Sequence, residues 1–194
     1  MPNSSVVYWI RNDLRLTDNP ALTAAVAAGL PIVPIFLWTP EEEGNWPAGA
    51  ATRAWLERSL DALSAAYVAL GSRLIIRQGP TRETLVDLAA KCGAETVFAS
   101  RRYEPAALRQ EATVRDALRE SGIALKMFNG SLLNAPNDVA NLAGEPYKVF
   151  TPYYNACLKR GPLSPAYPAP ESIPAPAAWP ESDSVASLHL SPDH

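Results

Sequence analysis

The chain has 194 residues, of which 47% are hydrophobic and 19% charged, and its formal net charge is -3. These values predict a soluble globular domain with a hydrophobic core, and the slight acidic excess argues against a surface that holds nucleic acid by bulk charge. Both histidines, His189 and His194, stand at the C-terminal end, which excludes a Ser-His-Asp triad or a His-rich metal site in the folded part.

Short apolar runs alternate with helical patterns along the first 128 residues. The apolar runs, rich in β-branched and aromatic residues, predict strands over 6–10, 32–37, 74–76, 96–99 and 123–128. Capping residues, prolines and terminal glycines delimit helices over 20–28, 52–70, 79–93 and 105–122. The second of these helices carries one apolar face, formed by Leu56, Leu60, Leu63, Tyr67 and Leu70. Residues 38–51 are predicted to form a loop.

This βαβαβαβαβ order has short connections, and each strand is a continuous apolar run. Both features predict a parallel sheet that is covered by helices on two faces. Right-handed crossovers then give an α/β fold with a doubly wound, five-stranded, Rossmann-like sheet. Beyond residue 130 the pattern weakens, and only residues 148–159 suggest a further short helix or turn.

A proline-rich segment follows, with seven prolines between positions 162 and 180. Such a segment forms neither helix nor sheet, because each proline lacks an amide donor and restricts the residue before it. We therefore expect an α/β domain over residues 1–161 and an extended interdomain linker over 162–194. Since no second domain follows the linker, the sequence is expected to be part of a longer protein.

The turn after the first strand departs from the usual dinucleotide fingerprint. It reads Arg11-Asn12-Asp13-Leu14-Arg15, and neither GxGxxG nor GxxxxGK[ST] occurs anywhere in the chain. Two interpretations have equal weight here: a ligand site, or an ion-pair cluster of Arg11, Asp13 and Arg15 at the end of the strand.

Open α/β sheets bind ligands at the carboxyl ends of their strands. Those positions hold aromatic and charged residues suited to a flat, partly charged small molecule, namely Arg11, Asp13, Trp38, Arg53, Arg77 and 101–104. We expect Trp46 and Trp55 to pack the loop onto the core, and the acidic run 41–43 to be a solvated loop. The cysteines, Cys92 and Cys157, lack CxxC spacing and a histidine partner, so we expect no disulfide framework, zinc site or catalytic thiol, and a cytoplasmic location.

Several motifs occur in the order found in one family. Residues 7–22, which read VYWIRNDLRLTDNPAL, resemble the "FRxDLRxxDNxAL" opening of DNA photolyases and cryptochromes, with Ile10 in place of the usual Phe. The RAWL helix at 53–56, the Tyr103-Glu104-Pro105 turn and the YKVFTPYY segment at 147–154 are also similar to family motifs. The resemblance covers roughly Val6 to Gly161.

This resemblance implies the N-terminal α/β domain of a two-domain light-driven protein. In many members that domain carries an antenna chromophore, which is a reduced folate, a deazaflavin or a flavin. The helical C-terminal domain holds the catalytic FAD and the damaged DNA, so this chain is not expected to act on DNA or to be catalytic alone. The antenna would be held by Arg11, Asp13, Trp38, Arg53, Tyr103 and Glu104. The best-known folate site also uses an Asn-Glu pair where this chain has Ala106 and Ala107.

Four hypotheses follow. The chain is the light-harvesting domain of a deoxyribodipyrimidine photolyase, or the same domain of a cryptochrome blue-light photoreceptor. Alternatively, it is a free-standing nucleotide-binding protein, which would need a glycine-rich phosphate loop, or a structural docking domain with an empty pocket. The expected partners are the FAD-binding domain of the parent chain and, only through that domain, DNA; no membrane association is expected.

Overall fold

The computed structural model describes residues 4–136, 138–160 and 165–191. The chain divides into two compact units, a larger one over 1–130 and 167–194 and a smaller one over 131–166. Each unit is described by itself.

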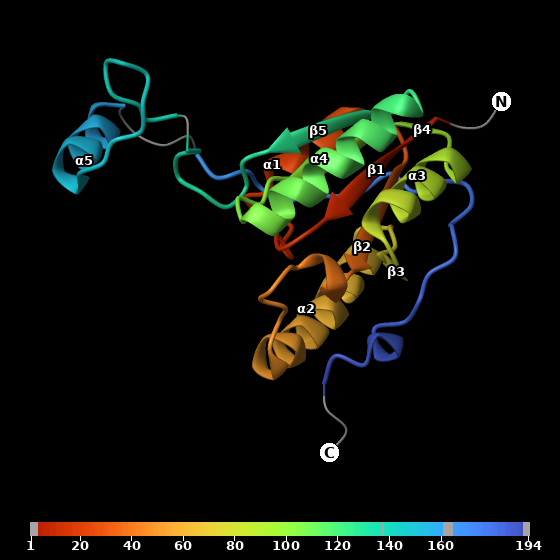
Figure 1. Cartoon of the computed structure of the whole chain (residues 1–194). Helices are drawn as coiled ribbons and strands as arrows, with labels where there is room; N and C mark the ends of the chain where they lie inside the picture. The colour runs from red at the N-terminus through yellow and green to blue at the C-terminus, as the bar shows by residue number, and fades with distance from the viewer. Residues whose placement is uncertain (1–3, 137, 161–164, 192–194) are drawn as a thin grey trace. The chain divides into compact units, whose positions relative to one another are not determined.

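The larger unit is built on a five-stranded sheet (Figure 1). Its strands are β1 (Ser5–Ile10), β2 (Ile32–Trp38), β3 (Ile75–Gln78), β4 (Ala94–Ser100) and β5 (Ala124–Phe128). All pairings are parallel and the strand order is β3-β2-β1-β4-β5. The chain therefore starts in the centre of the sheet, winds to one edge and then to the other, which confirms the predicted doubly wound fold.

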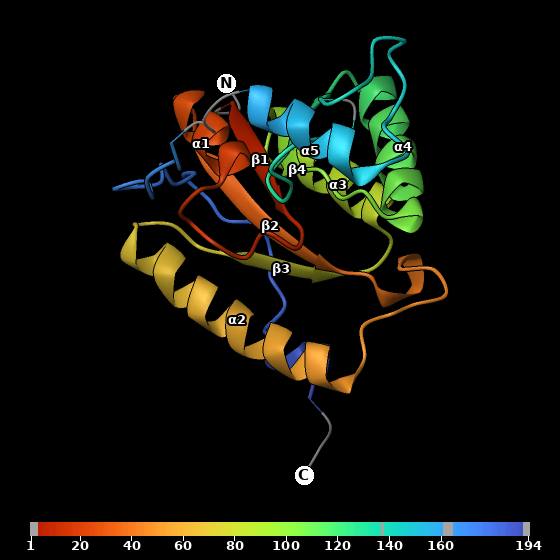
Figure 2. The ribbon, with the colours of Figure 1, turned by 90° about the vertical axis from the view of Figure 1, so that its left-hand side faces the viewer.

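Four helices cover the two faces of this sheet. They are α1 (Pro20–Ala27), α2 (Ala50–Ala69), α3 (Thr81–Lys91) and α4 (Pro105–Glu120). Side chains alternate along a strand, so Tyr8 of β1 packs in the core cluster with α1 and α2, whereas its neighbour Trp9 packs with α3 and α4. Figures 1 and 2 show these two layers of helices. Among the described residues, no helix combines the length and hydrophobicity needed to cross a bilayer.

The predicted helix boundaries agree with the structure to within two or three residues. Asn19 is the N-cap of α1, because its side-chain oxygen accepts a hydrogen bond from the backbone N–H of Leu22 at 3.0 Å. On α2, the predicted apolar face is buried at Leu60, Leu63 and Tyr67. The predicted loop after β2 contains one short 3-10 turn, Pro40–Glu42.

The C-terminal part of the larger unit forms a strap, which we define as residues 167–191. It has no helix or strand over 167–185 and only a 3-10 turn at Ala186–Leu188, as the prolines predict. The strap runs beside the edge strand β3, where Ile76 O accepts a hydrogen bond from Asp183 N at 2.8 Å. It also inserts Ile173, Leu188 and Leu190 into the core between α1, α2 and the sheet. It thus shields an edge strand that would otherwise expose unpaired backbone groups.

The smaller unit contains the helix α5 (Phe150–Lys159), in line with the short helix or turn expected near these residues. Within this unit, Arg160 Nη1 donates a hydrogen bond to the backbone oxygen of Asp138 at 2.6 Å. That the strap leads into a further domain stays a prediction. The expected domain boundary between residues 161 and 162 also stays a prediction, because it falls outside the residues that the structure describes.

If the strap stabilises the larger unit through its buried side chains, Ile173→Ala will lower its free energy of unfolding by about 2–5 kcal/mol, the usual range for such a truncation in a core. Ile173 is 2% exposed. Val68→Ala on α2 is the control, because Val68 is 66% exposed and its truncation should change stability by no more than about 0.5 kcal/mol. Urea denaturation of both variants measures the difference, and equal stabilities would contradict a structural role for the strap.

Candidate functional site

The turn after β1 is organised by one buried carboxylate. Asp13 Oδ2 accepts hydrogen bonds from the hydroxyls of Tyr8 at 2.8 Å and Ser100 at 2.7 Å, and from Asn19 Nδ2 at 3.3 Å. Its other oxygen, Oδ1, accepts from the backbone N–H of Arg11 at 3.0 Å. Burial and the nearby Asp13 charge raise the pKa of Tyr8 well above its ordinary value. Asp13 therefore joins β1, β4 and the start of α1, and its oxygens are occupied by the protein itself.

The side chain of Arg11 is buried beside this turn, with 5% of its surface exposed. Nη2 donates to Gln110 Oε1 at 2.7 Å, and the guanidinium lies 4.5 Å from the centre of the Trp9 ring. Nη1 is buried without a hydrogen-bond partner among the described residues. Burial, together with the positive charge of Arg102, lowers the pKa of Arg11 to about 10.

The interpretation of this turn as an ion-pair cluster is therefore wrong. The guanidinium of Arg15 donates to the backbone oxygens of Asp18 and Gly130, and that of Arg11 donates to Gln110. Asp13 meets Arg11 through the backbone N–H only.

A pocket of about 540 Å³ opens at the carboxyl ends of β1 and β2, close to Arg102 beyond the end of β4. Its walls carry four tryptophans, which are Trp9 in β1, Trp38 at the end of β2, Trp46 in the following loop and Trp55 in α2. Arg11, Arg102 and Gln110 contribute polar groups. Pockets of this size, mostly apolar with a few polar groups, are typical of small-molecule sites.

The loop between β2 and α2 is fixed by two glutamates, contrary to the expectation that 41–43 is simply solvated. Glu42 Oε1 accepts a hydrogen bond from the backbone N–H of Thr81, at the start of α3, at 2.8 Å, and its Oε2 accepts one from Gln110 Nε2 at 2.7 Å. Glu43 forms a two-pronged ion pair with Arg102, with N–O distances of 2.6 and 2.8 Å. Within the run, the solvated interpretation fits Glu41, which is exposed.

The expectation that Trp46 and Trp55 pack onto the core is also wrong. Trp46 is 90% exposed and Trp55 is 71% exposed. Both line the pocket, so their rings present apolar surface to solvent at its walls. Exposed aromatic surface of this kind is often part of a binding site.

The structure brings together two of the six predicted site residues, because Arg11 and Trp38 line the pocket. Asp13 lies in the buried network described above. Arg53, on the first turn of α2, has its Nε buried without a partner among the described residues and is not among the lining residues. Glu104, the N-cap of α4, is exposed and lies 3.4 Å from Arg102. Tyr103, which stands between Arg102 and Glu104 in the sequence, is half-buried and is also not among the residues that line the pocket.

Sequence reasoning missed Gln110 and Thr39, which also line the pocket. No local pattern singles out a glutamine inside an amphipathic helix. Arg102 stood among the strand-end residues, but nothing in the sequence distinguished it from Arg101. In the structure Arg101 pairs with Glu111 on α4, whereas Arg102 turns to the pocket.

The polar groups of this pocket fit a ligand that offers hydrogen-bond acceptors. Nε of Arg102 is buried without a partner among the described residues, as is Nη1 of Arg11. Buried donors are almost always satisfied in native structures, so these two N–H groups beside the pocket call for acceptor atoms that the described residues do not supply, from water or from a bound molecule.

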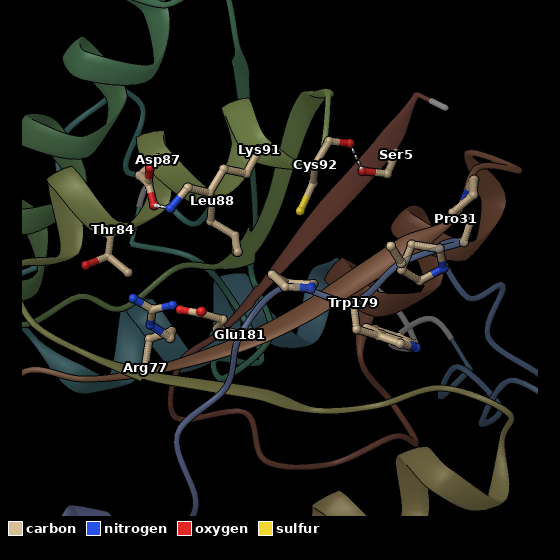
Figure 3. A pocket seen from close by; sticks show the side chains of 14 residues that line it. Ser5, Pro31, Arg77, Thr84, Asp87, Leu88, Lys91, Cys92, Trp179 and Glu181 are labelled. Carbon is tan, nitrogen blue, oxygen red and sulfur yellow. Dashed lines mark hydrogen bonds and ion pairs between the residues drawn. The ribbon is translucent and has the colours of Figure 1, made fainter. Parts of the chain in front are cut away.

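A second cavity, of about 640 Å³, lies between α3 and the strap (Figure 3). Two of its charged residues form an ion pair, with Lys91 Nζ 2.8 Å from Asp87 Oδ2, and Figure 3 shows Arg77 and Glu181 on the same side of the cavity. Trp179 contributes the aromatic ring of this cavity.

The fold is that of a doubly wound α/β domain, and its aromatic pocket lies at the carboxyl ends of the strands, where open α/β sheets commonly bind ligands. Residues 6–176 match the family described as DNA photolyase. The chain is 37% identical to a deoxyribodipyrimidine photo-lyase of Agrobacterium fabrum over 193 residues, which cover 99% of this chain and 40% of the relative. It is also 37% identical to cryptochrome-1 of Arabidopsis thaliana over 170 residues, covering 86% of this chain and 25% of that protein.

Solved structures give the same result. A bacterial class III photolyase from Agrobacterium tumefaciens superposes with a TM-score of 0.91 at 34% identity, covering 100% of this chain and 39% of that one. A Synechocystis cryptochrome superposes with a TM-score of 0.86 at 24% identity, covering 98% and 41%, and supports the fold alone. The chain belongs to the DNA photolyase family and corresponds to its N-terminal α/β domain. It spans 40% or less of the length of the curated relatives named above.

The network around Asp13 generates a testable prediction. Asp13→Asn replaces one of two accepting oxygens by an NH2 donor that faces donors of the protein, so we expect a loss of about 1–3 kcal/mol in unfolding free energy. Asp18→Asn is the matched control, because Asp18 is exposed and its positive φ of 48° suits asparagine equally well. Thermal or urea unfolding distinguishes the two. Unchanged stability of Asp13→Asn would show that this carboxylate does not hold the turn together.

Proposed function

We propose that this chain is the light-harvesting domain of a photolyase-type protein and binds an antenna chromophore in the pocket at the strand ends. The candidate chromophores are a reduced folate, a deazaflavin and a flavin. One observation carries the proposal: Arg11 and Arg102 line a pocket walled by tryptophans, and each keeps a buried guanidinium N–H without a partner among the described residues. All three candidates are flat ring systems that carry acceptor atoms.

The pocket residues divide into two kinds of contact. Trp38 and Trp55 supply aromatic rings that can stack on a ligand, and such stacking suits any aromatic ring regardless of its substituents. The two arginines supply directional donors that fix the orientation of such a ring. When bound, the chromophore supplies absorption in the near-UV or blue and passes its excitation to a flavin.

The parent protein is proposed to be a deoxyribodipyrimidine photolyase that uses light to repair UV-damaged DNA. The catalytic FAD and the DNA would be held by a further, helical domain, in the part of the family length that this chain does not span. A cryptochrome photoreceptor is the second candidate, because the Arabidopsis cryptochrome-1 is as similar in sequence as the Agrobacterium photo-lyase.

The smaller unit offers a surface for that further domain. Its apolar residues remain exposed: Phe150 stacks on Tyr154 at a centroid distance of 5.6 Å, yet 71% and 48% of these side chains is accessible. Leu142 and Leu158 are exposed as well. Apolar patches of this kind commonly mark interaction sites, so we propose that the FAD-binding domain of the parent chain covers them.

Chromophore binding can be tested on the 194-residue chain. Addition of a reduced folate, a deazaflavin or FMN should give a complex that absorbs in the near-UV or blue and survives gel filtration. Trp38→Leu should weaken that binding about 10-fold, since loss of ring stacking costs roughly 1.4 kcal/mol. Titration followed by tryptophan fluorescence measures the affinities.

Trp179→Leu serves as the control, because Trp179 lines the other cavity. Its affinity for the chromophore should equal that of the unmodified chain once circular dichroism has shown that the variant is folded. If none of the three chromophores binds, or if Trp179→Leu weakens binding as much as Trp38→Leu, the proposed pocket is wrong.

Docking of the smaller unit predicts a difference in hydrogen exchange. The amides of α5 should exchange faster in the 194-residue chain than in a protein of full family length, because the second domain would cover and stabilise the helix there. Strand β1, which is buried in the larger unit, is the internal reference. Equal exchange of α5 in both proteins would contradict the docking proposal.

A further inference from the structure

The second cavity, between α3 and the strap, differs in character between its two ends (Figure 3). One end lies at the start of the sheet, where Pro31 precedes β2 and Ser5 Oγ donates a hydrogen bond to the backbone oxygen of Cys92 at 2.8 Å. The other end holds Arg77, which pairs with Leu37 near the carboxyl end of β2. The cavity therefore extends along the direction of the strands.

Apolar groups form the end of the cavity at the start of the sheet. Trp179 of the strap and Pro31 lie on this side of the cavity in Figure 3. Trp179 is half-buried and packs against the core cluster that includes α3 and α4, so its ring is held in place. Leu88 of α3, which is 3% exposed, adds to the apolar wall. This end suits an aromatic ring, which can stack on the indole.

Arg77 contributes a positive charge without a partner to the opposite end. It is half-buried, and its guanidinium has neither a hydrogen bond nor an ion pair among the described residues. The other cation of the cavity, Lys91, is paired with Asp87 at 2.8 Å. Glu181 lies on the same side as Arg77 but is exposed, so water screens its charge. A guanidinium in this position can form charge-assisted hydrogen bonds with an anion.

We propose that this second cavity binds a small aromatic molecule with one anionic group, whose ring stacks on Trp179 and whose anionic group binds Arg77. The volume of about 640 Å³ is in the range of small-molecule sites. The cavity shares no lining residue with the pocket at the strand ends, so its ligand is independent of the antenna chromophore. Because the ligand contacts α3 and the strap together, its binding also holds the strap on the larger unit.

Alkylation of the two cysteines locates a bound probe. Cys92 lines the cavity, whereas Cys157 belongs to the smaller unit and is the internal reference. Burial, with the nearby charge of Asp87, raises the pKa of the Cys92 thiol, so the reaction with iodoacetamide is run at alkaline pH. Anilinonaphthalene sulfonate, an aromatic anion, should slow the alkylation of Cys92 several-fold and leave that of Cys157 unchanged. Mass spectrometry measures both rates, and the concentration dependence of the protection gives the affinity at this cavity.

Two charge variants should shift this affinity in opposite directions. Arg77→Gln should weaken binding of the sulfonate about 10-fold, the effect of losing one charge-assisted hydrogen bond. Glu181→Gln should strengthen it, because a negative charge on the same side of the cavity is removed. Phenylnaphthylamine, which has the same rings without the sulfonate, should bind both variants as it binds the unmodified chain. Trp179→Leu should weaken the binding of both molecules.

Trp38→Leu is the matched control, because Trp38 is half-buried like Trp179 but lines the other pocket. It should leave the protection of Cys92 unchanged. If the saturating sulfonate does not protect Cys92 in the unmodified chain, the cavity is not a binding site. If Arg77→Gln binds the sulfonate as tightly as the unmodified chain, the anionic group does not bind Arg77. Circular dichroism checks that each variant is folded, and where Trp179→Leu is not, the opposite shifts of the two charge variants decide.

Discussion

The carboxylate of Asp13 is the interaction on which the rest of the structure depends. It lies where the chain leaves the central strand β1, and its hydrogen bonds reach Ser100 at the end of β4 and Asn19, the N-cap of α1. After β1 the chain enters α1 on one face of the sheet, and after β4 it enters α4 on the other face. The ends of these two neighbouring strands are therefore not covered by a shared helix. A polar cluster fills that position, and its members satisfy one another, as buried polar groups must.

The close approach of later chain segments depends on the same cluster. Gly130 follows β5, and a Cβ atom at this position would lie 2.8 Å from Ser100 Oγ. Its backbone oxygen accepts a hydrogen bond from Arg15. A side chain here would displace the Ser100 hydroxyl from Asp13, so the sheet edge and the turn after β1 constrain each other.

The fold could be predicted from the sequence because its signals are local. Continuous apolar runs, prolines at helix starts and glycines at helix ends give the strands and helices, and their alternation gives the parallel sheet. The pocket could be predicted only in part. Arg11 and Trp38 follow directly from strand ends, whereas Glu42, Glu43 and Gln110 take part through contacts that span 29 to 99 residues along the chain. No local pattern indicates such contacts. An acidic run therefore predicts a solvated loop even where, as here, Arg102 and Gln110 bind two of its carboxylates.

The role of Arg11 illustrates why a motif and a structure answer different questions. The motif joins Arg11 and Asp13 in one short turn, which favours an ion pair between them. In the folded chain Asp13 is engaged by hydroxyl and amide donors from three other elements, so its charge is dispersed over those donors, and the Arg11 side chain is directed instead to α4. All the residues that line the pocket lie between Trp9 and Gln110, within the larger unit. The electrostatic character of the site is therefore set by residues of that unit.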